Sequence, residues 1–282
     1  MDHGQDHIAN IASFDRSTVR SYHPAIMIYR RHVPCPALSE FIELLWLFEN
    51  AAPSHVSERV LPTGTVELVI NLREGTGSFD SVAAGPHSRF FVLDTSRPSS
   101  LIGIHFKPGG AFPFLALPVD ELRNRHVSLE ALWGGRATEL RERLLATEGA
   151  EARLLLLERA LLSLLQRPHS RHAAVSHALA AFRRGPRRIA DVVDETGLSP
   201  RRFIRLFSDE VGLTPKSFCR IRRFQRTVAL LHRAQAVDWA ETALACGYSD
   251  QSHLIHDFQD FAGLSPARYL SRRTQHMNHV PQ

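Results

Sequence analysis

The sequence predicts an α+β protein of two domains: a β-rich, barrel-like or cupin-like N-terminal domain with helices, and an all-α C-terminal domain holding a double helix-turn-helix. Three observations lead to this prediction. Short apolar runs of period two, separated by glycine and proline, occur up to residue 107. Beyond residue 129 the apolar period lengthens to that of a helix, and beyond residue 170 one helical pattern occurs twice. The length of 282 residues suits two domains.

The composition is typical of a soluble globular protein. Hydrophobic residues make up 44% of the chain and charged residues 22%. No uninterrupted apolar stretch reaches the roughly 18 residues that a membrane span needs, and the N-terminus lacks the basic start and apolar core of a secretory signal. The three cysteines lie far apart, which argues against a disulfide framework or a cysteine-rich zinc module. We therefore expect a cytoplasmic protein with no membrane association.

The N-terminal half shows strand patterns. Residues 66–72 are apolar at alternate positions after a turn-like Pro-Thr-Gly, and residues 88–95 and 101–107 are further candidates. Residues 38–48 are apolar at a spacing that fits either a helix or a buried strand.

Two helices are expected next, at 129–145 and 152–165. The second is rich in leucine, and its wide apolar face requires a partner. That partner is either the barrel or the same helix of a second subunit.

The chain beyond residue 170 is expected to be wholly helical. Ser199, Ser249 and Ser265 are the expected N-caps, and Pro200 stands at a first helical position. The expected helices cover residues 173–183, 188–196, 200–211, 216–232, 239–246, 250–262 and 267–272.

A repeat within these helices is the most informative feature. Gly197 matches Gly247, and after one inserted residue Phe207 matches Phe258 and Pro215 matches Pro266. Each copy contains a helix, a glycine turn and a second helix with one apolar stripe, which is the pattern of a helix-turn-helix. The polar face of the second helix is then free to enter a DNA major groove about 12 Å wide.

The uneven distribution of charge fits either a nucleic-acid partner or a solvated basic surface. The formal net charge is +5, but residues 1–169 hold 17 basic and 19 acidic residues, whereas residues 170–282 hold 17 basic and 10 acidic ones. The positive excess therefore lies in the helical region, and all but two of the basic residues are arginine.

The polar faces of the two copies supply the candidate DNA-binding residues. Arginine can bond guanine edges, glutamine adenine edges, and serine either base. The candidates are Arg201, Arg202 and Arg205 in the first copy and Gln251, Ser252, His253 and His256 in the second.

At these residues the sequence resembles the DNA-binding domain of the AraC/XylS family of bacterial transcription regulators. The matching stretches are Gly197-Leu-Ser-Pro-Arg-Arg-Phe, Gly212-Leu-Thr-Pro and Gly247-Tyr-Ser-Asp-Gln-Ser-His-Leu. The resemblance implies two helix-turn-helix modules joined by the helix at 216–232, with reading helices in successive major grooves about 34 Å apart. The stretches Arg59-Val-Leu-Pro-Thr-Gly and Gly103-Ile-His-Phe-Lys-Pro-Gly-Gly resemble the N-terminal domain of an uncharacterised subgroup of that family, which implies a sensor-like β domain.

This organisation divides the chain. We expect a flexible N-terminus over residues 1–20, a β-rich sensor or dimerisation domain over 21–167, the DNA-binding domain over 168–273, and a flexible tail over 274–282.

The N-terminal domain offers one candidate ligand pocket, formed by Glu67, Asn71, His105 and Lys107. The alternative is that these residues form a polar row that faces solvent or fills the barrel. No metal site, cofactor site or catalytic pattern is recognised, because the spacings H-x-H, H-E-x-x-H, C-x-x-C and G-x-x-x-x-G-K-[ST] do not occur.

The sequence as a whole predicts a non-enzymatic, sequence-specific regulator of transcription. Its expected partner is double-stranded DNA, and RNA polymerase, a small-molecule effector and a second copy of the chain are further candidates. Two alternatives stay open: a cupin-like enzyme domain fused to a DNA-targeting module, and a protein–protein adaptor built from helical hairpins.

Overall fold

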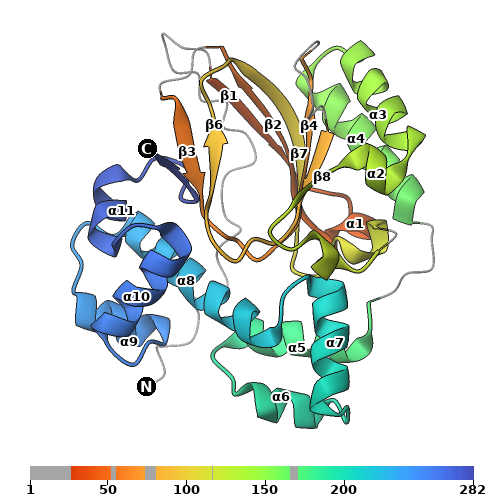
Figure 1. Cartoon of the computed structure of the whole chain (residues 1–282). Coiled ribbons are helices and arrows are strands. Elements are labelled where there is room, and N and C mark those ends of the chain that lie inside the picture. The colour runs from red at the N-terminus through yellow and green to blue at the C-terminus, as the bar shows by residue number, and fades with distance from the viewer. Residues whose placement is uncertain (1–26, 52–54, 74–80, 116, 166–170) are drawn as a thin grey trace, which may run out of the picture.

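The computed structural model describes residues 27–51, 55–73, 81–115, 117–165 and 171–282. Two antiparallel sheets form the N-terminal region, and helices form the C-terminal region (Figure 1). The larger sheet has the strand order β1-β2-β7-β4-β5-β8, and the smaller has the order β6-β3-β9. The strands are β1 (Met27–His32), β2 (Ile42–Asn50), β3 (Ser57–Val60), β4 (Glu67–Asn71), β5 (Ser81–Ala84), β6 (Phe91–Asp94), β7 (Ser99–Phe106), β8 (His126–Ser128) and β9 (His279–Pro281). The predicted β-rich and helical regions are thus confirmed.

Alternating side chains give the larger sheet one apolar face. In β4, Leu68 and Ile70 are buried, while Glu67, which pairs with His105 of β7, points to the other side. The strand predicted at residues 66–72 is therefore confirmed. The run 38–48, which fitted a helix or a strand, contains the end of the short helix α1 (Pro36–Ser39) and most of β2.

Helices cover the apolar face of this sheet, as Figure 1 shows. They are α2 (Leu129–Trp133), α3 (Gly135–Ala146) and α4 (Ala150–Leu165), so the helix predicted at 129–145 is two helices that separate at Gly134. Leu157 and Leu161 of α4 are fully buried in the same core as the sheet. Of the two partners considered for the leucine face, the structure provides the sheet.

The C-terminal helices follow the predicted order closely. Asp250, rather than the predicted Ser249, caps α10, because its carboxylate accepts a hydrogen bond of 2.8 Å from the backbone N–H of His253. Ser199 and Ser265 precede their helices as predicted. The helices are α5 (Ala173–Arg184), α6 (Ile189–Glu195), α7 (Pro200–Val211), α8 (Pro215–Arg233), α9 (Trp239–Cys246), α10 (Gln251–Ala262) and α11 (Pro266–Arg272).

An aromatic core holds these helices together. Phe207 of α7 lies 5.6 Å from Phe218 of α8, and Phe224 of α8 lies 5.0 Å from Phe258 of α10, measured between ring centroids. Leu61, which follows β3, is buried in this same core. Helix α8 thus packs against the second helix of both helix-turn-helix modules, and Leu61 of the β-rich region packs into the same core.

The β-rich region also contacts the helical region through the end of the chain. Strand β9 pairs antiparallel with β3, within the segment 274–282 for which the sequence predicted a flexible tail. Arg59 of β3 donates hydrogen bonds to the backbone oxygens of Ala262 and Gly263 at 3.2 and 3.0 Å, at the end of α10. The segment predicted as a flexible N-terminus and the predicted boundary at 167–168 lie outside the described residues.

A second contact joins the first module to the β-rich region. The end of α7 meets a 3-10 turn at Val119–Leu122. Gly212 has φ +81° there, and an added Cβ would lie 2.5 Å from Pro86 and 3.0 Å from the backbone oxygen of Val119. Only glycine allows this approach, which covers the C-terminal end of α7 and leaves its N-terminal half exposed.

Glu210, near the C-terminal end of α7, gives the stability of the fold a pH dependence. Its carboxylate accepts a hydrogen bond of 2.9 Å from the backbone N–H of His172, and its second oxygen has no hydrogen-bond partner among the described residues. Burial raises the pKa of Glu210 to about 7, against the opposing effects of the His172 hydrogen bond and the nearby Arg171; Asp209 adds to the increase. Between about pH 4.5 and pH 7, Glu210 is therefore protonated in the folded protein and ionised in the unfolded chain.

We expect the free energy of unfolding to fall as the pH rises through this window. The unfolded pKa is near 4.5, so the loss runs from about pH 4.5 to pH 7 and reaches at most about 3 kcal/mol. Glu210→Gln should remove this component, and Glu241→Gln, at an exposed position, should keep it. Urea unfolding at pH 5 and pH 8 measures the difference, and an unchanged pH dependence in Glu210→Gln would contradict the assignment.

Candidate nucleic-acid interface

The first module places three arginines on an exposed helix face. Gly197, with φ +67°, makes the turn between α6 and α7. Phe203 and Phe207 of α7 are fully buried, so the opposite face points outward. Arg201, Arg202 and Arg205 all lie on this outward face, as predicted. The Arg205 side chain is 85% exposed, and its one nearby carboxylate, Asp209, is 3.9 Å away.

The second module presents a polar face of different chemistry. Gly247, with φ +85°, makes the turn between α9 and α10. Gln251 and Ser252 are exposed, and the His256 side chain is 74% exposed. His253 is less free, because its ring nitrogens lie 3.1 Å from Arg223 and 3.1 Å from Ser249. Six of the seven candidate residues thus lie on exposed faces, and His253 is held by hydrogen bonds within the protein.

A buried carboxylate holds α10 against α8. Asp257 is 2% exposed and accepts hydrogen bonds of 2.5 Å from Arg220 and 2.8 Å from Arg223. Burial alone would raise the pKa of Asp257, but the two guanidinium groups outweigh it and hold the pKa below its usual value. Arg223 also stacks over Tyr248, 4.4 Å from the ring centroid. Sequence reasoning missed this network, because nothing in the spacing of residues 220, 223 and 257 relates them.

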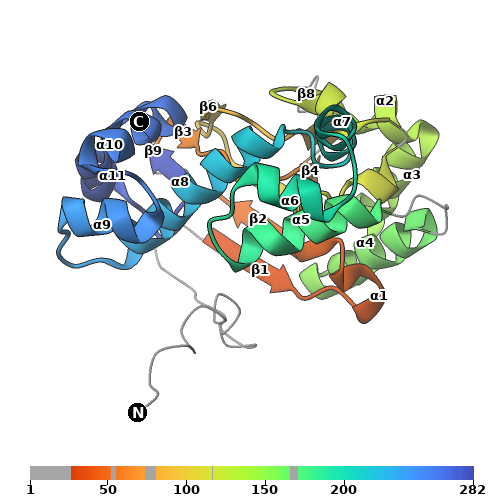
Figure 2. The ribbon, with the colours of Figure 1, turned by 90° about the horizontal axis from the view of Figure 1, so that it is seen from below.

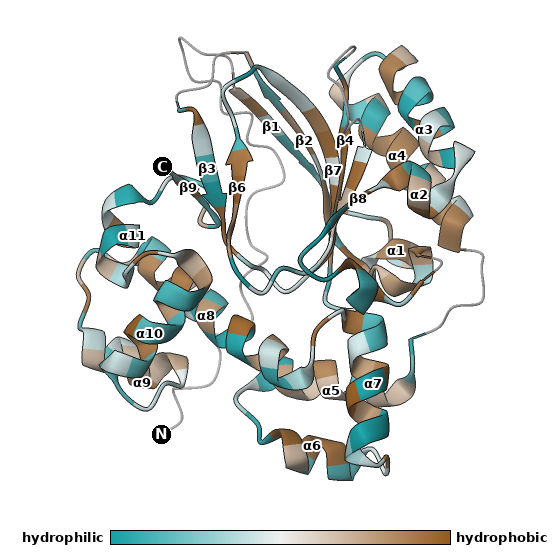
Figure 3. Cartoon of the chain, viewed as in Figure 1, coloured by the Kyte–Doolittle hydropathy of each residue, from teal (hydrophilic) through white to brown (hydrophobic). Residues whose placement is uncertain are grey.

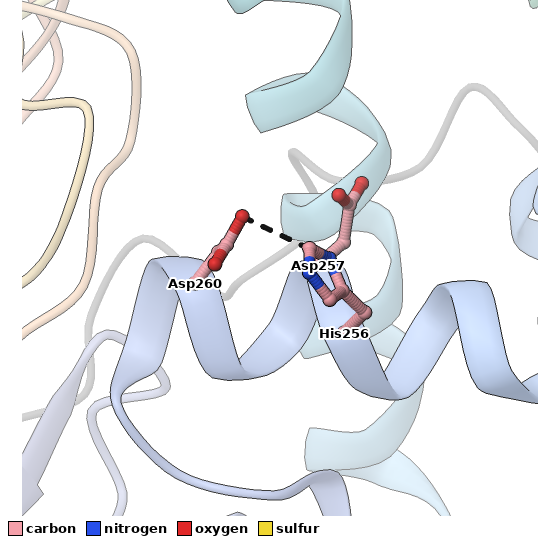
Figure 4. Close-up of side chains that lie close together, drawn as sticks. All are labelled: His256, Asp257 and Asp260. Atoms are coloured by element: carbon pink, nitrogen blue, oxygen red, sulfur yellow. Dashed lines mark ion pairs between the residues drawn. The ribbon is translucent and has the colours of Figure 1, made fainter.

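The same helix contains a cluster of potential metal ligands. Figure 4 shows His256, Asp257 and Asp260 side by side, with an ion pair between His256 and Asp260. Both oxygens of Asp257 already accept hydrogen bonds from arginine. A metal ion would have to displace these arginines, so we assign no metal site to these three residues.

Of the four candidates for the N-terminal pocket, Glu67 and His105 lie together, whereas Lys107 and Asn71 lie apart from them. The Glu67 carboxylate lies 3.8 Å from the His105 ring and accepts a hydrogen bond of 2.9 Å from Trp46. Burial opposes the charged form of Glu67, but His105 and Trp46 outweigh it and lower the pKa, while Glu67 raises the pKa of His105 against burial. Lys107 instead donates to the backbone oxygen of Ser39 at 2.5 Å, and Asn71 lies at the far end of β4.

Comparison with protein families assigns the two regions of the chain separately. Residues 192–272, which span α6 to α11, match the family described as helix-turn-helix domain. The C-terminal region is a helix-turn-helix domain of the AraC type. Helix-turn-helix domains of this type bind double-stranded DNA, so this region of the chain is a DNA-binding domain. Residues 30–128 match a domain of unknown function, DUF6597.

Solved structures show weaker similarity. A transcriptional regulator of Chromobacterium violaceum with an AraC-type DNA-binding domain is 24% identical, over 36% of this chain and 93% of that chain, with a TM-score of 0.33. ToxT from Vibrio cholerae O395 is 10% identical, over 88% of this chain and 97% of that chain, with a TM-score of 0.40. The xylose-binding transcription activator xylR is 18% identical over 54% of this chain and 41% of that chain, with a TM-score of 0.32.

Comparison with curated proteins gave no significant match. Within the described segments of the chain, none of the helices combines the length and apolar character that a membrane crossing requires. The assignment of the AraC-type domain rests on the sequence match and agrees with the helix order.

Proposed function

We propose that this chain is a sequence-specific regulator of transcription whose helices α7 and α10 read successive major grooves of one duplex. The observation that carries the proposal is the exposure of polar side chains on both helices, each directly after a glycine turn. Both helices are amphipathic, with alternating hydrophilic and hydrophobic bands in Figure 3. Their apolar sides pack in the protein, so only the polar sides are free for DNA.

The two reading helices differ in charge, and we propose that they divide the work. Helix α7 carries three exposed arginines, whereas α10 carries no arginine and has Asp250 at its start and Asp260 near its end. Arginine contacts to phosphate supply affinity that depends on salt, while contacts to base edges supply specificity. Helix α7 therefore provides most of the electrostatic anchoring, and α10 contributes through Gln251, Ser252 and His256.

We further propose that the β-rich region regulates the DNA-binding domain. The Glu67–His105 pair lies on the sheet face opposite the covering helices, where a small-molecule effector could replace or extend its hydrogen bonds. The β-rich region contacts α7 through Gly212 and α10 through Arg59. A ligand that shifts the sheet would therefore change the positions of both reading helices and the affinity for DNA. RNA polymerase and a second copy of the chain are the other partners that we propose.

Selection of duplexes from a random-sequence library by the full-length chain tests the proposal. We expect enrichment of one motif that spans about two helical turns. Failure to enrich any motif at low salt would contradict sequence-specific binding and favour the adaptor alternative. Turnover assays on the full-length chain test the enzyme alternative.

A further inference from the structure

A basic groove of about 600 Å³ lies between the two helix-turn-helix modules. The residues that line it come mainly from one side of α8, from the segment before α6 and from the first half of α10. Figure 2 shows α8 running between α6 and α10. Six basic side chains line it: Arg187, Lys216, Arg220, Arg222, Arg223 and Arg226. Within the part of the chain that the structure describes, Asp257 is the one carboxylate that lines it.

Acidic neighbours compensate only half of these charges. Arg220 and Arg223 share Asp257, and Arg187 pairs with Glu195 at 2.5 Å. No carboxylate of the described residues forms an ion pair with the other three: Lys216, Arg222 and Arg226. Burial, followed by the neighbouring Arg226 and Arg183, lowers the pKa of the Arg222 guanidinium. The groove is therefore a place where an anion would relieve repulsion between like charges.

The shape of the charged row indicates an extended anion. Position 226 lies ten residues after position 216 on one helix, which is about 15 Å along its axis. A single phosphate is too small to contact both ends of such a row, whereas each strand of duplex DNA carries one phosphate per about 3.4 Å of axis. His253 and His256 of α10 also line the groove, so it opens beside the reading face of the second module.

We propose that this groove binds the sugar–phosphate backbone of the DNA segment that runs between the two reading helices. The inference rests on the proposed function and adds a partner surface to it. Helices in successive major grooves leave the intervening backbone facing the segment that joins them, which here is α8. Lys216, Arg222 and Arg226 contact phosphates, while Arg220 and Arg223 stay with Asp257. These contacts add affinity without sequence preference.

The salt dependence of DNA binding tests this inference. The double variant Lys216→Gln/Arg226→Gln is compared with the full-length parent on a duplex of about 30 base pairs, long enough for two major grooves. We expect the slope of log affinity against log salt to fall by about two, because each lost phosphate contact removes about 0.9. The loss should be equal on a selected motif and on a random duplex. The control Arg136→Gln/Arg143→Gln removes the same charge from exposed positions of α3 and should leave the slope unchanged.

Two outcomes overturn the inference and leave the proposed function intact. One is DNA binding with an unchanged slope in the double variant. The other is a groove that binds free pyrophosphate tightly and loses it in the double variant while the DNA slope stays the same, which would assign it to a small anion. Absence of DNA binding by the parent itself would instead overturn the proposed function. Circular dichroism of the variants checks that the helices remain folded.

Discussion

Replacing Asp257 by alanine is expected to lower the free energy of unfolding by about 2–3 kcal/mol. The carboxylate is buried between α10 and α8. Its loss leaves Arg223 without an ion-pair partner among the described residues, and leaves Arg220 with the more exposed Asp260 alone. The Arg220 side chain is 37% exposed and that of Arg223 is 22% exposed, so water solvates both guanidinium groups in part after the carboxylate is lost. The expected loss of stability is therefore at or below about 3 kcal/mol, which marks the lower end of the range for a fully buried ion pair. Urea unfolding followed by circular dichroism measures the change.

Asp260 provides the matched control on the same helix. Its replacement removes the same charge, and it also contacts Arg220, at 3.2 Å, but its side chain is 41% exposed. Exposed ion pairs contribute little, so Asp260→Ala should cost less than about 1 kcal/mol. Equal losses in the two variants would mean that net charge, rather than the buried network, stabilises α10.

The sequence was sufficient to place the helices of the DNA-binding domain. Their apolar stripes repeat at helical spacing, and proline and glycine mark their ends, so α7 and α9 begin and end at the predicted residues. The alternating apolar positions of residues 66–72 likewise predicted the buried face of β4. Exposure of the candidate residues followed from the stripes, because a helix that buries one face leaves the other outside.

The long-range contacts could not be predicted in this way. β9 pairs with β3 across more than two hundred residues, and neither segment has a pattern that names its partner. Asp257 lies at helical spacing with the buried Leu254 and Phe261, and two arginines of α8 meet its carboxylate there. Lys107 occupies the polar side of its strand as expected, but its long side chain reaches the backbone of Ser39 rather than Glu67. Periodicity specifies a face, whereas these contacts depend on tertiary packing.

These contacts couple the DNA-binding domain mechanically to the β-rich region. Each reading helix has its C-terminal end covered, α7 by the turn at Val119–Leu122 and α10 by Arg59. Their N-terminal halves, which hold Arg201 and Gln251, stay exposed. The residues proposed to touch DNA and the residues proposed to transmit a change from the sheet therefore lie at opposite ends of the same two helices. Either set can be altered without changing the other.

The double variant Arg201→Ala/Arg205→Ala is expected to lose most of the DNA affinity of the chain. The two guanidinium groups lie on the exposed face of α7, and among the described residues only Arg205 forms an ion pair, with Asp209 at 3.9 Å. If each neutralises one phosphate, the slope of log affinity against log salt falls by about one for each arginine. Competition binding over a range of salt concentrations measures the slope for the full-length chain and for each variant.

The matched comparison is Gln251→Ala/His256→Ala on α10. Neither residue carries a fixed positive charge, so this variant should keep the slope and instead reduce discrimination between the selected motif and its mismatches, by about 1–3 kcal/mol for a lost base contact. The contrast separates anchoring from reading within one chain. An equal or larger loss of slope from the α10 variant would contradict the division of work between the helices.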